Sequence, residues 1–134
     1  MSFRVYVTTP DPPEDNITYE EWLEIEMKFR LYDEPLDGDS NFYEHWHVFA
    51  VELNLQYLSQ VYKNGLQIQT ETEFQALEDE VFLLMKHWRN QLSRKVLHHQ
   101  SPNTYLLSHL YERASLLLIG VTIARNEGAA LSIS

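Results

Sequence analysis

A glutamate and a histidine three positions apart on a helix could share a metal ion. Glu44 and His47 have this spacing, and on a helix their side chains would project from one face. Helical bundles that hold two metal ions combine two Glu-x-x-His pairs with two further carboxylates. The chain has no second pair in this order, and the nearest complement is the reversed pair His109 and Glu112. These four residues indicate either a transition-metal site or ordinary polar positions near helix ends.

The window DEPLDGDSNFYE, which overlaps this pair at Glu44, resembles the calcium-binding loop of an EF-hand. That loop takes oxygen ligands at positions 1, 3, 5, 9 and 12, with glycine at position 6 for its sharp turn. The window has oxygen-bearing side chains at positions 1, 5, 9 and 12, and Gly38 stands at position 6; the four residues are Asp33, Asp37, Asn41 and Glu44. Pro35 replaces the ligand at position 3, and no second loop exists to pair with this one. The window is therefore either a weak calcium site or a solvated turn-forming loop.

Other common catalytic signatures are missing from the sequence. The chain has no cysteine, which excludes thiolate nucleophiles, cysteine-ligated zinc and disulfides. It also lacks a Gly-x-Ser-x-Gly elbow and a glycine-rich phosphate loop, and it has only four glycines. We therefore expect no resident cofactor and favour a binding protein over an enzyme.

Acidic residues are concentrated in the first third of the chain. The whole chain has a net charge of −10, and residues 1–44 hold 12 acids against 3 bases, a net charge of −9. Phosphate binding depends on cationic side chains that release counterions, so we expect no nucleic-acid partner. The acidic surface either keeps the protein dissolved or docks against a basic protein.

The docking alternative is the leading functional prediction. A small anionic protein associates quickly with a cationic surface by electrostatic steering, which suits an inhibitor or immunity-type protein that covers a cationic cleft. The residues predicted to contact this basic partner are Asp11, Glu14, Asp15, Tyr19, Glu20, Glu21 and Glu24. The apolar width of the predicted helices is also compatible with a homodimer.

The pattern of apolar residues predicts one mainly helical domain over residues 1–134. The opening FRVYVTT alternates apolar and polar residues, which is typical of a half-buried strand within residues 1–9. A proline-rich linker over 10–17 cannot continue that strand, because proline removes backbone donors. Residues 18–125 are expected to be helical, and the tail over 126–134 could form a short strand paired with the opening one.

Two helices are expected in the first half of the chain. Thr18 with Glu21 forms a capping box, which predicts a shorter helix over about 19–32. Apolar residues then recur at helical spacing over 41–65, and Gly65 can end this long helix in a left-handed conformation.

Two more long helices are expected in the second half. Thr70 and Glu73 form another capping box, and apolar residues from Phe74 to Leu92 recur at spacings of three and four. The last helix begins near Pro102 and contains Gly120, where we expect close packing against a neighbouring helix. Three long helices and one shorter N-terminal helix predict a helical bundle.

Neither a secretory signal nor a membrane span is expected. The opening residues lack a basic start followed by an apolar run. The longest apolar run, Ala114–Ala124, is about half of the roughly 20 residues that a bilayer requires. We therefore expect a soluble, cytoplasmic protein that does not bind membranes.

Overall fold

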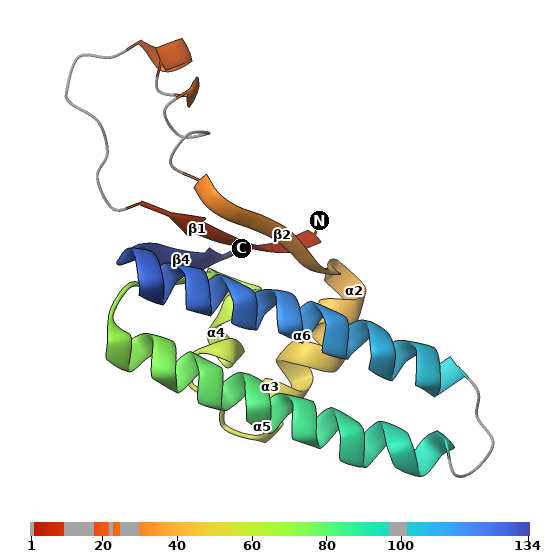
Figure 1. Ribbon diagram of the computed structural model, residues 1–134. Coiled ribbons are helices and arrows are strands. Elements are labelled where there is room, and N and C mark those ends of the chain that lie inside the picture. The colour runs from red at the N-terminus through yellow and green to blue at the C-terminus, as the bar shows by residue number, and fades with distance from the viewer. Residues whose placement is uncertain (1, 10–17, 22, 25–29, 97–101) are drawn as a thin grey trace.

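An antiparallel sheet and a layer of helices make up the protein (Figure 1). The computed structural model describes residues 2–9, 18–21, 23–24, 30–96 and 102–134. The strands are β1 (Ser2–Thr8), β2 (Arg30–Gly38), β3 (Leu66–Ile68) and β4 (Ala130–Ile133). The helices are α2 (Asp39–Phe42), α3 (Val48–Glu52), α4 (Leu58–Asn64), α5 (Glu71–Val96) and α6 (Pro102–Glu127), with a π-helical turn η1 (Tyr43–His47) between α2 and α3.

The predicted helical bundle is wrong, because four strands form a sheet in the order β2-β1-β4-β3. Only two long helices are present in the described chain, α5 and α6, each of 26 residues. The predicted pairing of the opening strand with the C-terminal tail is confirmed, since Val5 lies opposite Ile133 and Val7 opposite Leu131. Strand β2, on the other side of β1, occupies residues that were expected to end a helix and form an acidic loop.

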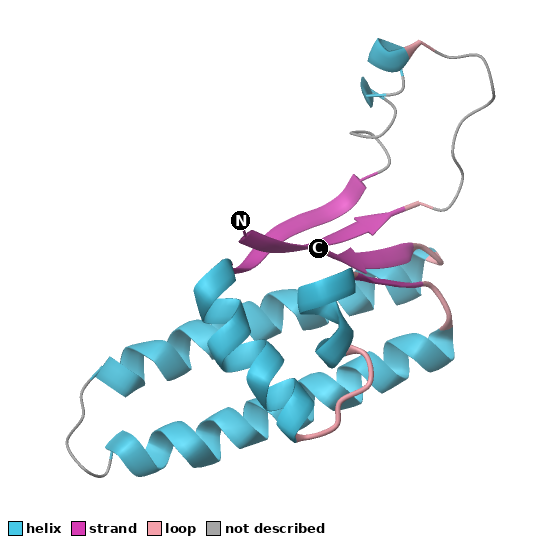
Figure 2. Ribbon diagram, turned by 180° about the vertical axis from the view of Figure 1, so that it is seen from behind, coloured by secondary structure: helices cyan, strands magenta, loops and turns pink. Residues whose placement is uncertain are grey.

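In the described part of the chain, helices α2 to α6 cover one face of the sheet. Phe3, Val5 and Val7 of β1 are buried, whereas Arg4 and Tyr6 between them are partly exposed. Figures 1 and 2 show helices α2 to α6 on the same side of the sheet in both views. The alternation of apolar and polar residues in β1 therefore reflects a sheet with one face in the core and one outside.

The expected helix over 41–65 is interrupted at Asn54, whose φ of 57° is left-handed. Helix α3 ends at Glu52, and α4 begins as a separate helix at Leu58. A carboxylate from α5 accepts hydrogen bonds from the backbone amides at the start of α4. Glu80 accepts hydrogen bonds from the backbone N–H of Leu58 at 2.9 Å and of Tyr57 at 3.1 Å. A carboxylate at a helix N-terminus satisfies unpaired amides and interacts favourably with the helix dipole. A contact between distant segments therefore stabilises the break, and apolar periodicity carries no sign of it.

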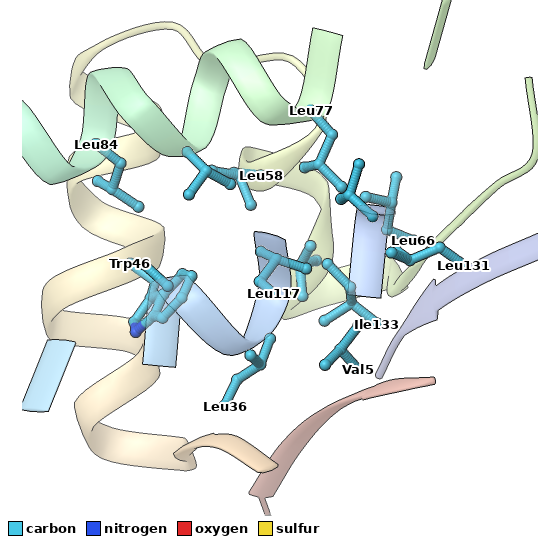
Figure 3. Close-up of a cluster of buried hydrophobic side chains, with 14 of the residues drawn as sticks. Val5, Leu36, Trp46, Leu58, Leu66, Leu77, Leu84, Leu117, Leu131 and Ile133 are labelled. Atoms are coloured by element: carbon cyan, nitrogen blue, oxygen red, sulfur yellow. The ribbon is translucent and has the colours of Figure 1, made fainter. Parts of the chain in front are cut away.

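One hydrophobic core joins the sheet to the helices (Figure 3). Side chains drawn there come from the sheet (Val5, Leu36, Leu66, Leu131, Ile133) and from the helical layer (Trp46, Leu58, Leu77, Leu84, Leu117). The rings of Trp46 and Trp88 are fully buried and meet edge to face, with centroids 5.0 Å apart. The indole N–H of Trp88 donates a hydrogen bond to the carbonyl of His45, so its polar atom is satisfied inside the core.

Helix α6 packs closely against the sheet at Gly120. A Cβ atom at this position would lie 3.2 Å from Cγ2 of Val5 and 3.3 Å from Cε1 of Tyr32. The close packing expected at Gly120 is therefore present, but its neighbour is the sheet and not a helix. The hydroxyl of Tyr32 donates to the carbonyl of Leu116 at 2.8 Å, and burial raises the pKa of Tyr32 to about 12.

The segment Thr104–Glu127 of α6 is long and apolar enough, by length and composition alone, to cross a membrane. A helix that packs in a protein core satisfies the same criteria. In this structure Leu110, Leu117 and Val121 of α6 are buried. The apolar character of α6 is thus used, at least on this face, in the core between the sheet and α5.

Replacing Gly120 with alanine is expected to destabilise the protein by about 1 kcal/mol. Alanine gains up to about 1 kcal/mol over glycine in a helix interior, whereas overpacking a filled core costs about 1–3 kcal/mol. Val5 is held in the sheet and Tyr32 by its hydrogen bond, so neither neighbour yields easily. Urea unfolding measures the net change in the free energy of unfolding. The control is Thr122→Ala, at an exposed position on the same helix. An unchanged or higher free energy of unfolding for Gly120→Ala would contradict the close packing.

Candidate functional site

Asp37 is a buried carboxylate at the end of β2, with a side chain that is 5% exposed. Its Oδ1 accepts a hydrogen bond from Nδ2 of Asn41 at 2.9 Å and lies 3.0 Å from Nε2 of His109. Its Oδ2 accepts a hydrogen bond from the indole N–H of Trp46 at 3.2 Å. Burying a carboxylate is costly unless its oxygens are satisfied, and here the three partners come from α2, α6 and η1.

The structure brings together residues that the sequence assigned to different sites. Asp37 was a candidate calcium ligand and His109 a candidate transition-metal ligand, and the two contact each other. Asp33 has different partners, since it accepts hydrogen bonds from Nε of Arg4 at 2.9 Å and Nη1 of Arg30 at 3.2 Å. Residues 33–38 are extended in β2, not wound into the loop that a calcium site of this type requires.

The other candidate metal ligands have different surroundings. Glu44 and Glu112 are exposed, on η1 and α6 respectively. His47 is buried, and its ring packs against those of Tyr43 and Tyr62, with centroid distances of 5.5 and 5.2 Å. Within the described ranges, no three histidine, aspartate or glutamate residues are placed to hold one metal ion.

The pair of Asp37 and His109 resembles, in geometry, the carboxylate and histidine of a catalytic triad, in which the carboxylate orients the histidine that acts as general base. The imidazole side chain is 36% exposed, and a buried carboxylate fixes one of its nitrogens. Nucleophilic catalysis also needs a hydroxyl or thiol bonded to the other nitrogen. Among the described residues no such group contacts His109, so these contacts support a structural role in which the pair joins β2 to α6. The calcium-loop pattern grouped Asn41 with Asp37, but as two metal ligands and not as a hydrogen-bonded pair. No pattern along the chain indicated that Trp46 completes the cluster.

The predicted docking residues lie on a segment between β1 and β2. Residues 19–21 and 23–24 are helical, and Oγ1 of Thr18 accepts a hydrogen bond from the N–H of Glu21 at 3.2 Å, which confirms the predicted N-cap. Glu20 and Glu24 are exposed, as is Glu21, and Tyr19 is 73% exposed. Asp11, Glu14 and Asp15 lie outside the described residues. Figure 1 shows the helical residues beyond the end of the sheet, away from the helical layer.

Fewer acids of the first third are exposed and uncompensated than the residue count suggests. Asp37 is buried, and the charge of Asp33 is balanced by Arg4 and Arg30. The guanidinium of Arg30 also lies 4.8 Å from the centre of the Tyr6 ring. The outer face of β1 and β2 therefore carries compensated charge. In the described chain, the glutamates of residues 18–24 remain the densest group of exposed acids near the sheet.

The chain matches no protein-family model, no curated protein and no solved structure. Its function therefore has to be inferred from its own residues.

Replacing Asp37 with alanine is expected to lower the free energy of unfolding by about 3 kcal/mol, because the donors on Trp46 and Asn41 lose their acceptor. The matched control is Asp33→Ala in the same strand, which removes two partly exposed ion pairs and should cost no more than about 1 kcal/mol. Urea unfolding of both variants measures the difference. Equal losses would show that the Asp37 cluster does not hold the sheet to the helices.

His47 is expected to make stability depend on pH. Burial, and secondarily the charge of Lys63, lower the pKa of His47 below its ordinary value. Its Nδ1 is buried without a hydrogen-bond partner. The unfolded chain therefore takes up this proton more readily than the folded one. The contribution of His47 is complete above the unfolded pKa of about 6.5 and is lost as the pH falls below it.

The variant His47→Phe keeps the aromatic packing and removes the titrating group. Between about pH 7 and pH 5 its free energy of unfolding should fall less steeply than that of the wild type. Urea unfolding at a series of pH values gives both slopes. Identical slopes would mean that another group causes the pH dependence.

Proposed function

We propose that this protein is an interaction module that binds a basic protein partner through an acidic segment between two paired strands. The observation that carries this proposal is the length and charge of that connection. Thr8 pairs with Arg30, so the two strand ends are direct neighbours in the sheet. Two residues are enough to connect paired antiparallel strands. The chain instead places 21 residues there, over 9–29, with seven acids and one base.

A long connection that contributes little to a core is usually retained for binding or regulation. The described part of this one supports that view, because the side chains of Tyr19, Glu20, Glu21 and Glu24 are exposed. The carboxylates supply long-range attraction to a cationic surface, and the tyrosine supplies the large contact area that is typical of binding hot spots.

The sheet holds both ends of the connection in place. β1 is paired on both sides, with β2 and with β4, and three of its side chains are buried. The strand ends from which the acidic segment starts and to which it returns are therefore fixed by the core. This arrangement limits the conformational entropy that is lost when a partner binds. It suits an inhibitor or immunity-type protein, in which the acidic segment covers a cationic cleft.

The triple variant Glu20→Gln, Glu21→Gln, Glu24→Gln is expected to lose partner binding. The immobilised wild-type chain should retain proteins of high isoelectric point from lysate of the native host, identified by mass spectrometry. With a purified partner obtained in this way, the association rate should fall steeply as the salt concentration rises. The triple variant should associate about 10-fold or more slowly at low salt.

The control is a second triple variant, Glu44→Gln, Glu52→Gln, Glu112→Gln, which changes the net charge by the same amount at exposed positions on the helical layer. It should associate at close to the wild-type rate. Equal losses in the two triple variants would assign binding to net charge and not to the acidic segment. Retention of acidic or neutral proteins only would contradict the proposal.

A further inference from the structure

Helix α5 lies on the side of the helical layer away from the sheet (Figures 1 and 2). One face of it is buried through Phe74, Leu77, Val81, Leu84 and Trp88. The opposite face is exposed along Gln75, Asp79, Phe82, Leu83, Lys86 and Asn90. At the centre of this exposed face, Phe82 is 50% and Leu83 is 53% exposed. Two adjacent large apolar side chains are therefore half in solvent on one surface helix, which makes this face a candidate contact surface.

Asp79 and Lys86 are placed symmetrically about these two residues. Asp79 precedes Phe82 by three positions and Leu83 by four, so it borders both side chains. Lys86 follows Leu83 by three positions and Phe82 by four, so it borders both from the other end. A two-fold axis across the helix between Phe82 and Leu83 exchanges Asp79 with Lys86. Two copies of α5 packed antiparallel about this axis would therefore match opposite charges as well as apolar side chains.

A pocket lies beside this patch and offers a place for an apolar side chain. It has a volume of about 250 Å³ and is lined by Leu53, Leu83, Lys86, His87 and Asn90. Leu83 and Lys86 thus belong both to the patch and to the pocket wall. In the antiparallel arrangement, Phe82 of a second copy meets Leu83 at the edge of this pocket, and the reciprocal contact follows by symmetry.

Asp79 and Lys86 do not neutralise each other within one chain. They are separated by seven residues, which corresponds to about 10.5 Å along a helix. Asp79 instead accepts a hydrogen bond from Nε2 of Gln75 at 3.0 Å. A second copy supplies the opposite charge to each of them at the same time.

We propose that α5 forms the interface of an antiparallel homodimer, centred on Phe82 and Leu83 and flanked by two reciprocal ion pairs between Asp79 and Lys86. This interface lies on the side of the helical layer away from the sheet, so both sheets and both acidic segments remain uncovered. The dimer displays two acidic segments and can bind two basic surfaces, or two sites on one partner, with increased avidity. The dimer itself does not depend on the proposed function.

Charge reversal tests the interface directly. Sedimentation equilibrium of the wild-type chain should give twice the 15.9 kDa of one chain. Asp79→Lys and Lys86→Glu should each raise the dissociation constant at least about 10-fold, because each change places like charges in both ion pairs. The double variant Asp79→Lys, Lys86→Glu should return to within about 3-fold of the wild type, because both pairs are restored with reversed sign.

Mixing the two single variants gives the sharpest outcome. Each variant alone is weakened, yet in the mixture the lysine introduced into one chain faces the glutamate introduced into the other. The unchanged Asp79 and Lys86 also stay opposite each other, so the mixture should form a heterodimer although both chains carry net negative charge. Glu127→Lys, at an exposed position of α6, changes net charge as Asp79→Lys does and should remain dimeric. Circular dichroism verifies that each variant is folded.

A wild-type chain that stays monomeric across the concentration range would overturn the proposal and leave the face to a different protein. A dimer that tolerates both single reversals would place the interface elsewhere. Failure of the double variant and of the mixture to associate would exclude the antiparallel register.

Discussion

The buried carboxylate of Asp37 determines how the sheet meets the helices. It stands at the end of β2 and forms contacts with side chains from α2, η1 and α6. A single carboxylate therefore connects the edge strand β2 to the segment that follows it and to the last helix. A carboxylate in this position is stable only while its partners stay in place, which makes their relative positions mutually dependent. Glu80 of α5 is a second buried carboxylate that joins distant segments, because it binds the backbone amides at the start of α4.

These buried carboxylates also shape the electrostatics of the protein. Of the acids in the chain, Asp37 and Glu80 are engaged in internal contacts, and Asp33 is compensated by two arginines. Other exposed acids are spread over the helical layer, whereas the connection between β1 and β2 holds seven acids within 21 residues. Residues 18–21 and 23–24 of this connection have exposed side chains, so substitutions there leave the packing of the sheet intact.

The two proposed interaction surfaces lie at different sides of the molecule and use different physics. Binding through the acidic segment would depend on long-range attraction and would therefore be sensitive to salt. The exposed face of α5 combines a small apolar centre with short-range ion pairs, which favours self-association in one register. An assembly built on α5 would present the acidic segments outward. The same small chain can thereby provide both a scaffold and a repeated binding element.

Features that depend on neighbours within a few turns could be predicted from the amino-acid order. The capping residues Thr18 and Thr70, the extents of α5 and α6, and the alternation in β1 follow from local hydrogen bonding and apolar periodicity. Pairing with β1 made residues 30–38 a strand, although the helical periodicity before them was a competing signal. Long-range packing also fixed the break at Asn54 and the meeting of Asp37 with His109, which are 72 residues apart. Those features rest on contacts between distant segments, and spacing along the chain does not encode such contacts.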